Sequence, residues 1–118
     1  MAYMLLIMEE PDQRATRTEA EGRAVFDRMV RWGNGLKERG LLQGMESLSS
    51  PDGDSARVQV RGGKSSLVDG PFAEAKEMVG GFYLLNCATR EEALAIAARC
   101  PAAEWATVEV RETAPCYL

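Results

Sequence analysis

The stretch AYMLLIM, residues 2–8, decides the fold because it is apolar on both sides of an extended chain. Successive side chains of a strand point to opposite faces, and a short run that is apolar at every position is typical of a strand buried on both faces. The run FYLLNC, residues 82–87, has a similar pattern. We therefore expect these two runs to be the central strands of one sheet.

A first helix is predicted from about Thr18 to Arg39. Thr18 is followed three residues later by Glu21, the pattern of a capping box in which each side chain accepts a hydrogen bond from the other residue's backbone amide. Gly40 fits the left-handed position just after the helix end. The apolar stripe, with Phe26 beside it, consists of Val25, Met29, Trp32 and Leu36.

The segment GNG, residues 33–35, interrupts this helical pattern, since each glycine costs about 1 kcal/mol relative to alanine in a helix. Either the helix bends there or another backbone approaches closely, and the sequence leaves both open. A second helix is predicted from Thr89, where Glu92 repeats the capping box, and Pro101 ends it. Its inner face is formed by Ala93, Ile96, Ala97 and Cys100.

The other segments predict strands. Residues 41–49 are weakly patterned, whereas ARVQVR, residues 56–61, alternates cleanly. The glycines at 62–63 predict a tight hairpin turn, and KSSLVD, residues 64–69, returns from it. ATVEVRE, residues 106–112, alternates and is the last of the predicted strands.

The order of these elements predicts an α+β fold in a single domain, residues 1–118. Two β-α-β halves with both helices on one face give a ferredoxin-like sheet, here with an inserted β-hairpin. Residues 2–8 and 82–87 are expected in its centre and residues 106–112 at an edge.

Two helices cover only one face of such a sheet, so the other face is expected to expose apolar side chains. Those that we expect there from the first strand are Tyr3, Leu5 and Ile7, together with part of residues 82–87. Each large side chain left exposed forgoes roughly 1.5–3 kcal/mol, and the joint patch exceeds what monomers usually show. We predict a homodimer whose sheets stack as a dimeric α+β barrel. The alternatives are that the hairpin, residues 56–69, or the C-terminal APCYL covers this face.

Composition excludes several classes of protein. The net charge of −4 argues against a nucleic-acid partner, which needs a clustered basic face. The chain has no histidine, which removes the commonest general base and metal ligand. Its three cysteines, Cys87, Cys100 and Cys116, are widely spaced, so we predict no disulfide framework, no metal site and no cofactor. The apolar run near the N-terminus is too short to span a bilayer and lacks a basic leader, so we expect a cytoplasmic protein without membrane contact.

The segment VDGPFAEAKEMVGGFYLL, residues 68–85, resembles the hallmark of the DGPF domain within the YCII-related family. The surrounding segments YMLLIM, VRGGKSSLVDG, EEALAIAARCP and VEVRE also match, so the resemblance covers nearly the whole chain. It implies a dimeric α+β barrel of ferredoxin-like subunits. It also implies two functions, namely a small-molecule enzyme or binder with a histidine–aspartate pair, and an accessory role with extracytoplasmic-function sigma factors. Because this chain lacks histidine, the pair cannot be transferred as it stands.

Our hypothesis for function is a homodimer that binds a small molecule, with or without catalysis, in a cleft at the dimer interface. The candidate catalytic residue is Asp69. The candidate ligand-binding residues are Gly70, Pro71, Phe72, Glu74, Lys76 and Tyr83. Crowded carboxylates beside an ammonium group suit acid–base chemistry near neutral pH.

These residues also have a structural explanation, which the sequence favours. Asp69, Gly70 and Pro71 are the residue types of a tight turn, the charges of residues 74–77 suit a solvated helical turn, and Tyr83 suits a core position. Two competing functions stay open, namely an interaction module for a sigma factor and a dimer without any ligand site.

Overall fold

The computed structural model describes residues 2–50, 55–69 and 76–118. The strands are β1 (Tyr3–Glu9), β2 (Leu42–Ser47), β3 (Ala56–Arg61), β4 (Lys64–Asp69), β5 (Met78–Leu85) and β6 (Thr107–Glu112). The helices are α1 (Glu19–Glu38) and α2 (Arg90–Ala98), with short 3-10 helices η1 (Gln13–Thr16) and η2 (Pro101–Glu104). None of the helices in these ranges has the length and hydropathy of a membrane span.

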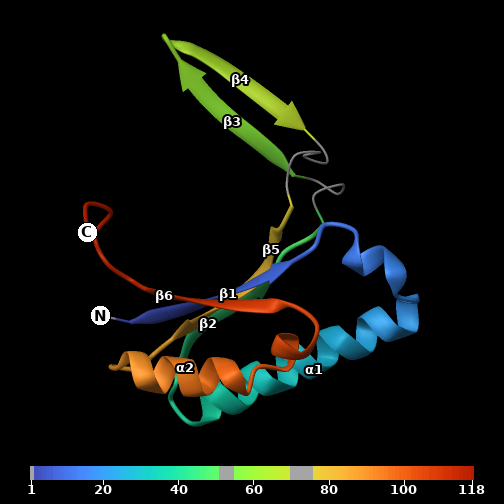
Figure 1. Cartoon of the computed structure of the whole chain (residues 1–118), viewed down its shortest axis with the longest axis vertical. Coiled ribbons are helices and arrows are strands. Elements are labelled where there is room, and N and C mark those ends of the chain that lie inside the picture. Colours follow the sequence, from blue (N-terminus) through green and yellow to red (C-terminus); the bar gives the residue numbers. More distant parts are fainter. Residues whose placement is uncertain (1, 51–54, 70–75) are drawn as a thin grey trace.

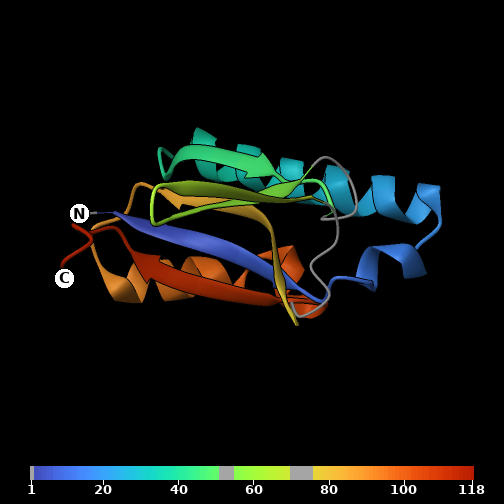
Figure 2. The same cartoon turned by 90° about the horizontal axis from the view of Figure 1, so that it is seen from above.

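Four strands form an antiparallel sheet in the order β2-β5-β1-β6, and β3 pairs with β4 in a separate hairpin (Figure 1). Both helices lie along one face of the sheet, side by side (Figures 1 and 2). This arrangement confirms the predicted ferredoxin-like α+β fold with an inserted hairpin. β1 and β5 are the central strands and β6 is an edge strand, as predicted.

The helix ends follow from their capping residues. At the start of α1, the Glu21 amide donates to Thr18 Oγ1 at 3.1 Å and the Thr18 amide donates to Glu21 Oε1 at 2.9 Å, which confirms the capping box. Gly40 follows the helix with φ +71°, the left-handed conformation expected there. At α2 only half of the predicted box forms, because the Glu92 carboxylate accepts from the amide of Ala88 rather than from that of Thr89.

The predicted orientation of β1 is wrong. Tyr3, Leu5 and Ile7 face the helices and belong to the core, whereas Met4, Leu6 and Met8 lie on the open face. Because the side-chain period of a strand is two, an apolar run on both parities does not reveal which parity faces the helices. Packing decides it: the three residues join a core that also includes Leu36 of α1, Leu85 of β5 and Ala93 of α2, each 0% exposed.

The central strand β5 begins at Met78, so the pair Gly80 and Gly81 lies inside it rather than before it. Ile7 pairs with Gly81 and Met8 with Val79, which leaves Gly80 as the extra residue of a β-bulge. A Cβ on Gly81 would stand 2.8 Å from the carbonyl oxygen of Glu46 on the neighbouring strand, so only glycine fits without a shift of the backbone.

The segment GNG does not interrupt α1, which is continuous from Glu19 to Glu38. Gly33 is buried, and a Cβ there would overlap the Met45 side chain and approach the Tyr83 ring at 3.0 Å. Gly33 therefore permits a close approach between α1 and the sheet. The approaching atoms belong to side chains of the sheet and not to another backbone. At Gly35, by contrast, a Cβ would have no atom within 4 Å.

This difference gives a matched pair of substitutions two residues apart. Gly33→Ala should lower the free energy of unfolding by about 1–3 kcal/mol, because it overpacks the contact with Met45 and Tyr83. Gly35→Ala should raise it by about 0.5–1 kcal/mol, because alanine favours the helix and meets nothing. Urea unfolding of both variants measures the two effects. Equal effects of the two substitutions would contradict this assignment.

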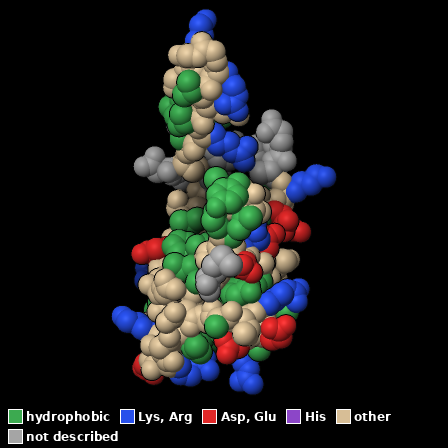
Figure 3. All heavy atoms as spheres, turned by 90° about the vertical axis from the view of Figure 1, so that its left-hand side faces the viewer, with side chains coloured by type: hydrophobic (Ala, Val, Ile, Leu, Met, Phe, Trp, Pro, Cys, Tyr) green, Lys and Arg blue, Asp and Glu red, His purple; other side chains and the backbone are tan. Residues whose placement is uncertain are grey.

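The sheet face opposite the helices is apolar in its middle and charged at its edges. The register places Met4 opposite Leu84, and Leu6 opposite Phe82, with all four side chains half-buried. On β6 the same cross-strand rows end in exposed charged residues, Arg111 beside Met4 and Glu109 beside Leu6. Figure 3 shows hydrophobic side chains on the hairpin and directly below it.

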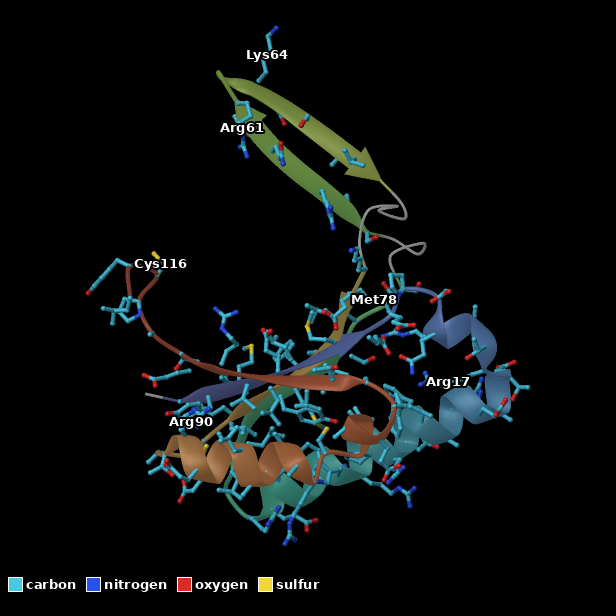
Figure 4. The ribbon with its side chains drawn as sticks, in the orientation of Figure 1. Arg17, Arg61, Lys64, Met78, Arg90 and Cys116 are labelled. Carbon is cyan, nitrogen blue, oxygen red and sulfur yellow. The ribbon has the colours of Figure 1, made fainter. Side chains whose placement is uncertain are left out.

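The hairpin projects from the side of the sheet opposite the helices and does not cover that face (Figure 1). Its turn glycines, Gly62 and Gly63, have φ of +57° and +76°, as a type I′ turn requires. Arg61 and Lys64 stand at its far tip (Figure 4). The C-terminal residues do not cover the face either, since Leu118 is 82% exposed. Neither alternative cover considered from the sequence is therefore present.

Candidate functional site

Only some of the predicted site residues lie within the described residues. Asp69 is the last residue of β4, where its backbone pairs with Ala56. Residues 70–75 lie outside the described residues, so the predictions for Gly70, Pro71, Phe72 and Glu74 stay untested. Lys76 is exposed just before β5, whereas Tyr83 is buried well inside that strand. The prediction that both belong to one ligand site stays untested.

Tyr83 is an anchor of the core. Its hydroxyl donates a hydrogen bond of 2.8 Å to the backbone carbonyl of Met29 in α1. Its ring meets Trp32 edge to face, with ring centroids 5.0 Å apart and an interplanar angle of 85°. Burial raises the pKa of the Tyr83 phenol above the value of about 10 that tyrosine has in an unfolded chain. The side chain thus fixes α1 to the sheet in its neutral form.

This raised pKa predicts a loss of stability in alkali. Above about pH 10 the unfolded chain releases a proton that the folded protein keeps, so the contribution of Tyr83 is complete below pH 10 and is lost as the pH rises further. We expect the loss in the free energy of unfolding to reach about 1 kcal/mol at one pH unit above 10. In Tyr83→Phe the free energy of unfolding, measured in urea across this range, should decline less than in the wild type. Tyr117→Phe, at an 82% exposed position, is the control and should keep the wild-type decline.

A cavity of about 700 Å³ opens between the N-terminal half of α1 and the adjoining end of the sheet. Its apolar wall comes mainly from one side of α1, where Val25, Phe26, Met29 and Val30 follow helical spacing. Tyr83 and Trp105 line it from β5 and from the segment after η2. The C-terminal half of the same helix packs on the core through Leu36, whereas here the space beneath the helix is open. Ligand pockets typically measure about 300–1,000 Å³.

An ion pair forms part of the lining of this cavity. Arg14 of η1 donates from Nε to Glu9 Oε1 at 2.7 Å, and its Nη2 lies 2.6 Å from the same oxygen. Its other donors reach the backbone carbonyls of Leu48 at 2.7 Å and Gly80 at 3.2 Å. The side chains are 5% exposed for Glu9 and 30% exposed for Arg14. The guanidinium group therefore joins the end of β1 to β5 and to the residue after β2.

Gly80 makes room for this pair. A Cβ at this position would overlap the Glu9 carboxylate and approach Arg14 Nη2 at 2.9 Å. The bulge at Gly80 and the burial of Glu9 therefore occur together, because the extra residue of β5 opens the space that the carboxylate occupies.

The second carboxylate oxygen of Glu9, Oε2, has no hydrogen-bond donor among the described residues. Among the described residues, every buried side-chain oxygen that has no contact with solvent has a hydrogen-bond partner. Oε2 must therefore keep contact with solvent, and the open space that Glu9 lines is the cavity. The site thus offers an acceptor atom on a nearly buried, negatively charged side chain.

Two arginines cover the Trp105 side of the cavity. Arg17, between η1 and α1 (Figure 4), has its guanidinium carbon 5.8 Å from the centroid of the Trp105 ring, and that of Arg28 lies 5.7 Å from it. Arg28 also binds Glu104 with two hydrogen bonds of 2.8 and 2.9 Å, which hold the pKa of the Glu104 carboxyl below its usual range. Both guanidinium groups thus lie over the Trp105 ring, and Arg17 also lines the cavity.

Of the described residues that line this site, the sequence analysis named only Tyr83 as a candidate. It assigned no role to Glu9, Arg14 or Trp105. One signal was available, because Glu9 continues the parity of Tyr3, Leu5 and Ile7, the side of β1 that packs against the helices. Among the described residues no cluster of acidic residues and cysteines is arranged to hold a metal ion.

Comparison with known proteins agrees with the resemblance carried by the motif. The family model of the YCII-related domain matches residues 1–116. An uncharacterized protein of Rhizobium meliloti (strain 1021) is 46% identical over 44 residues, which are 37% of this chain and 36% of that protein. The matched segment thus spans about a third of the relative, whose description names no activity. Since the family model covers nearly the whole chain, the protein belongs to the YCII-related domain family.

Proposed function

We propose that the protein acts as a homodimer that binds a small molecule in the cavity between α1 and the sheet. In this dimer the two sheets pack face to face through the row of Met4, Leu6, Phe82 and Leu84. Each of these side chains is apolar and half-buried in the single chain. A second copy is the simplest cover, because the face is apolar at its centre and carries both signs of charge, Arg111 and Glu109, at its β6 edge.

The hairpin supports the same arrangement. Val58 pairs with Leu67, and Val60 lies on the same side two residues on, so three apolar residues share one face. Val58, Leu67 and Val60 are 64%, 61% and 58% exposed, respectively. An isolated two-stranded hairpin is marginal in water, so a hairpin that projects with its apolar face exposed needs a partner surface. The second subunit supplies that surface when each hairpin lies across the other chain.

The cavity carries the ligand-binding part of the proposal. Its volume of about 700 Å³ suits a small molecule, and it combines an apolar wall with one buried polar group, the composition typical of ligand sites. The cleft that the sequence predicts at the dimer interface, with Asp69 as its candidate catalytic residue, lies next to residues outside the described ranges, and it stays a prediction. Its test is Asp69→Asn, which should leave the dimer folded and weaken ligand binding.

Sedimentation velocity tests the dimer. The chain has a mass of 12.9 kDa, and we expect one species of about twice that mass at micromolar concentration. A single 12.9 kDa species would reject the homodimer and leave the open face to a different protein partner. A thermal-shift screen against a metabolite library tests binding, because a ligand that binds only the native state raises its apparent stability.

A further inference from the structure

The charged groups of the cavity indicate which ligand it takes. Each nitrogen of the Arg14 guanidinium group contacts a protein oxygen, namely one of the Glu9 carboxylate or of the carbonyls of Leu48 and Gly80. Arg17 is held over the Trp105 ring. In contrast, Glu9 Oε2 has no donor among the described residues. A ligand that displaces solvent from Oε2 must therefore bring a hydrogen-bond donor of its own.

The charge of the acceptor favours a charged donor. The described residues that line the cavity include three carboxylates, Glu9, Glu19 and Glu46, and two guanidinium groups, Arg14 and Arg17. Glu19 is paired with Arg23, so these charges balance overall. The preference arises at Glu9 Oε2 itself, because a charge-assisted hydrogen bond to a carboxylate is stronger than a neutral one. A ligand carboxylate placed at Oε2 would instead meet a like charge, which is unfavourable.

The residues that line the cavity indicate the chemistry of the rest of the ligand. Val25, Met29 and Tyr83 give it an apolar lining, and Trp105 adds an aromatic ring. Phe26 lines the same cavity and is 52% exposed, a large apolar side chain that a bound ligand would cover. An apolar, preferably aromatic body fits these surfaces.

We infer that the cavity binds a small amphipathic amine, with its ammonium group on Glu9 Oε2 and its apolar body along α1 and Trp105. This inference rests on the proposed function, since it assigns the chemical class of the ligand to the same cavity. Glu9 is the specificity-determining residue, and Arg14 is a positioning residue that holds one carboxylate oxygen so that the other faces the ligand.

Three matched probes test the inference on the full chain: 2-phenylethylamine, 2-phenylethanol and 3-phenylpropanoate. They share an aromatic body and differ in the head group. Amide NMR titration locates binding through the shifts of Gly22 and Gly80, and gives dissociation constants. We expect the amine to bind about tenfold or more tightly than the carboxylate, with the alcohol between them. If 3-phenylpropanoate binds as tightly as the amine or more tightly, the assignment of an amine ligand is wrong, although the cavity is still a ligand site.

Glu9→Gln tests the role of the carboxylate. Glutamine keeps the shape of the side chain but removes its charge, so the guanidinium group of Arg14 is left without its counter-ion. The preference for the amine should vanish or invert toward 3-phenylpropanoate, while 2-phenylethanol binding should change less than about threefold. Glu38→Gln, near the C-terminal end of α1 and outside the cavity lining, carries the same charge change and should keep the wild-type preference. An unchanged preference in Glu9→Gln would contradict the inference.

Gly22→Leu separates failure of the ligand class from failure of the site. Gly22 lines the cavity, and a Cβ there meets no atom within 4 Å, so this position can accept the Cβ of a side chain, and leucine favours the helix. It should abolish binding of all three probes. Gly35→Leu, on the same helix with equally open surroundings, is the matched control and should bind normally. If no probe shifts Gly22 or Gly80 in the wild type, the cavity is not a ligand site and the proposed function fails with it.

Discussion

Replacing Val58 and Leu67 together by lysine should convert the protein from a dimer into a folded monomer. The two side chains face each other across the hairpin and are 64% and 61% exposed, so lysine meets no clash in the single chain. In the proposed dimer the same positions lie against the second subunit, where two unpaired charges lose their hydration. We expect the dissociation constant of the dimer to rise by about a hundredfold or more. Sedimentation equilibrium over a range of concentrations measures it.

The matched control uses the opposite face of the same hairpin. Gln59 pairs with Ser66, the next pair along the ladder, and both are exposed. Gln59→Lys with Ser66→Lys adds the same charge to the same strands but points it away from the apolar face, and the dimer should persist. Circular dichroism confirms that both variants fold. If the variant with lysine at Val58 and Leu67 remains a dimer, the dimer contact lies elsewhere. If both variants are monomers, the added net charge rather than the apolar face explains the dissociation.

Arg14→Met should lower the free energy of unfolding by about 3 kcal/mol at neutral pH. The substitution leaves the Glu9 carboxylate, only 5% exposed, without its counter-ion, and it removes the hydrogen bonds to the carbonyls of Leu48 and Gly80. Removing one partner of a buried ion pair typically costs about 3–5 kcal/mol. The 30% exposure of Arg14 places the expected loss at the lower end of that range. Urea unfolding at a fixed protein concentration is the measurement, since association also contributes to stability.

Two further variants show whether the cost arises from the uncompensated charge. The double variant Glu9→Gln with Arg14→Met should recover part of the loss, because no buried charge then lacks a partner. Arg23→Met breaks an ion pair with Glu19 whose side chains are 77% and 82% exposed, and it should change stability by less than about 1 kcal/mol. If Arg14→Met lowered the free energy of unfolding as little as Arg23→Met, the Glu9 pair would be no stronger than a surface contact. The positioning role of Arg14 would then be rejected.

Local patterns in the sequence predicted the elements well, because their causes are local. The capping box at Thr18, the left-handed Gly40 and the hairpin turn at 62–63 each depend on a few neighbouring residues, and all three are present. Where the pattern was ambiguous, the prediction was wrong. A strand that is apolar on both parities does not reveal its inner face, so Tyr3 was placed on the open side although it packs beneath the helices.

The cavity could not be predicted in the same way, since its parts come from distant segments. Glu9, Gly80 and Trp105 are brought together only by the pairing of β1 with β5 and by the approach of η2 to α1. Each has an ordinary local explanation on its own, namely a charge after a strand, a glycine in a motif and an unpatterned aromatic residue. Their chemistry appears only when the bulge at Gly80 makes room for the carboxylate.

The sequence by itself determined the order of strands and helices, the ends of α1 and the family, because hydrophobic period, capping and the motif of residues 68–85 are properties of adjacent residues. Only the tertiary structure decided which side of β1 is buried, why Gly33 is glycine and where Glu9 meets Arg14. Those features depend on which segments pack against one another, and a contact between segments far apart in the chain leaves no periodic signal in either of them.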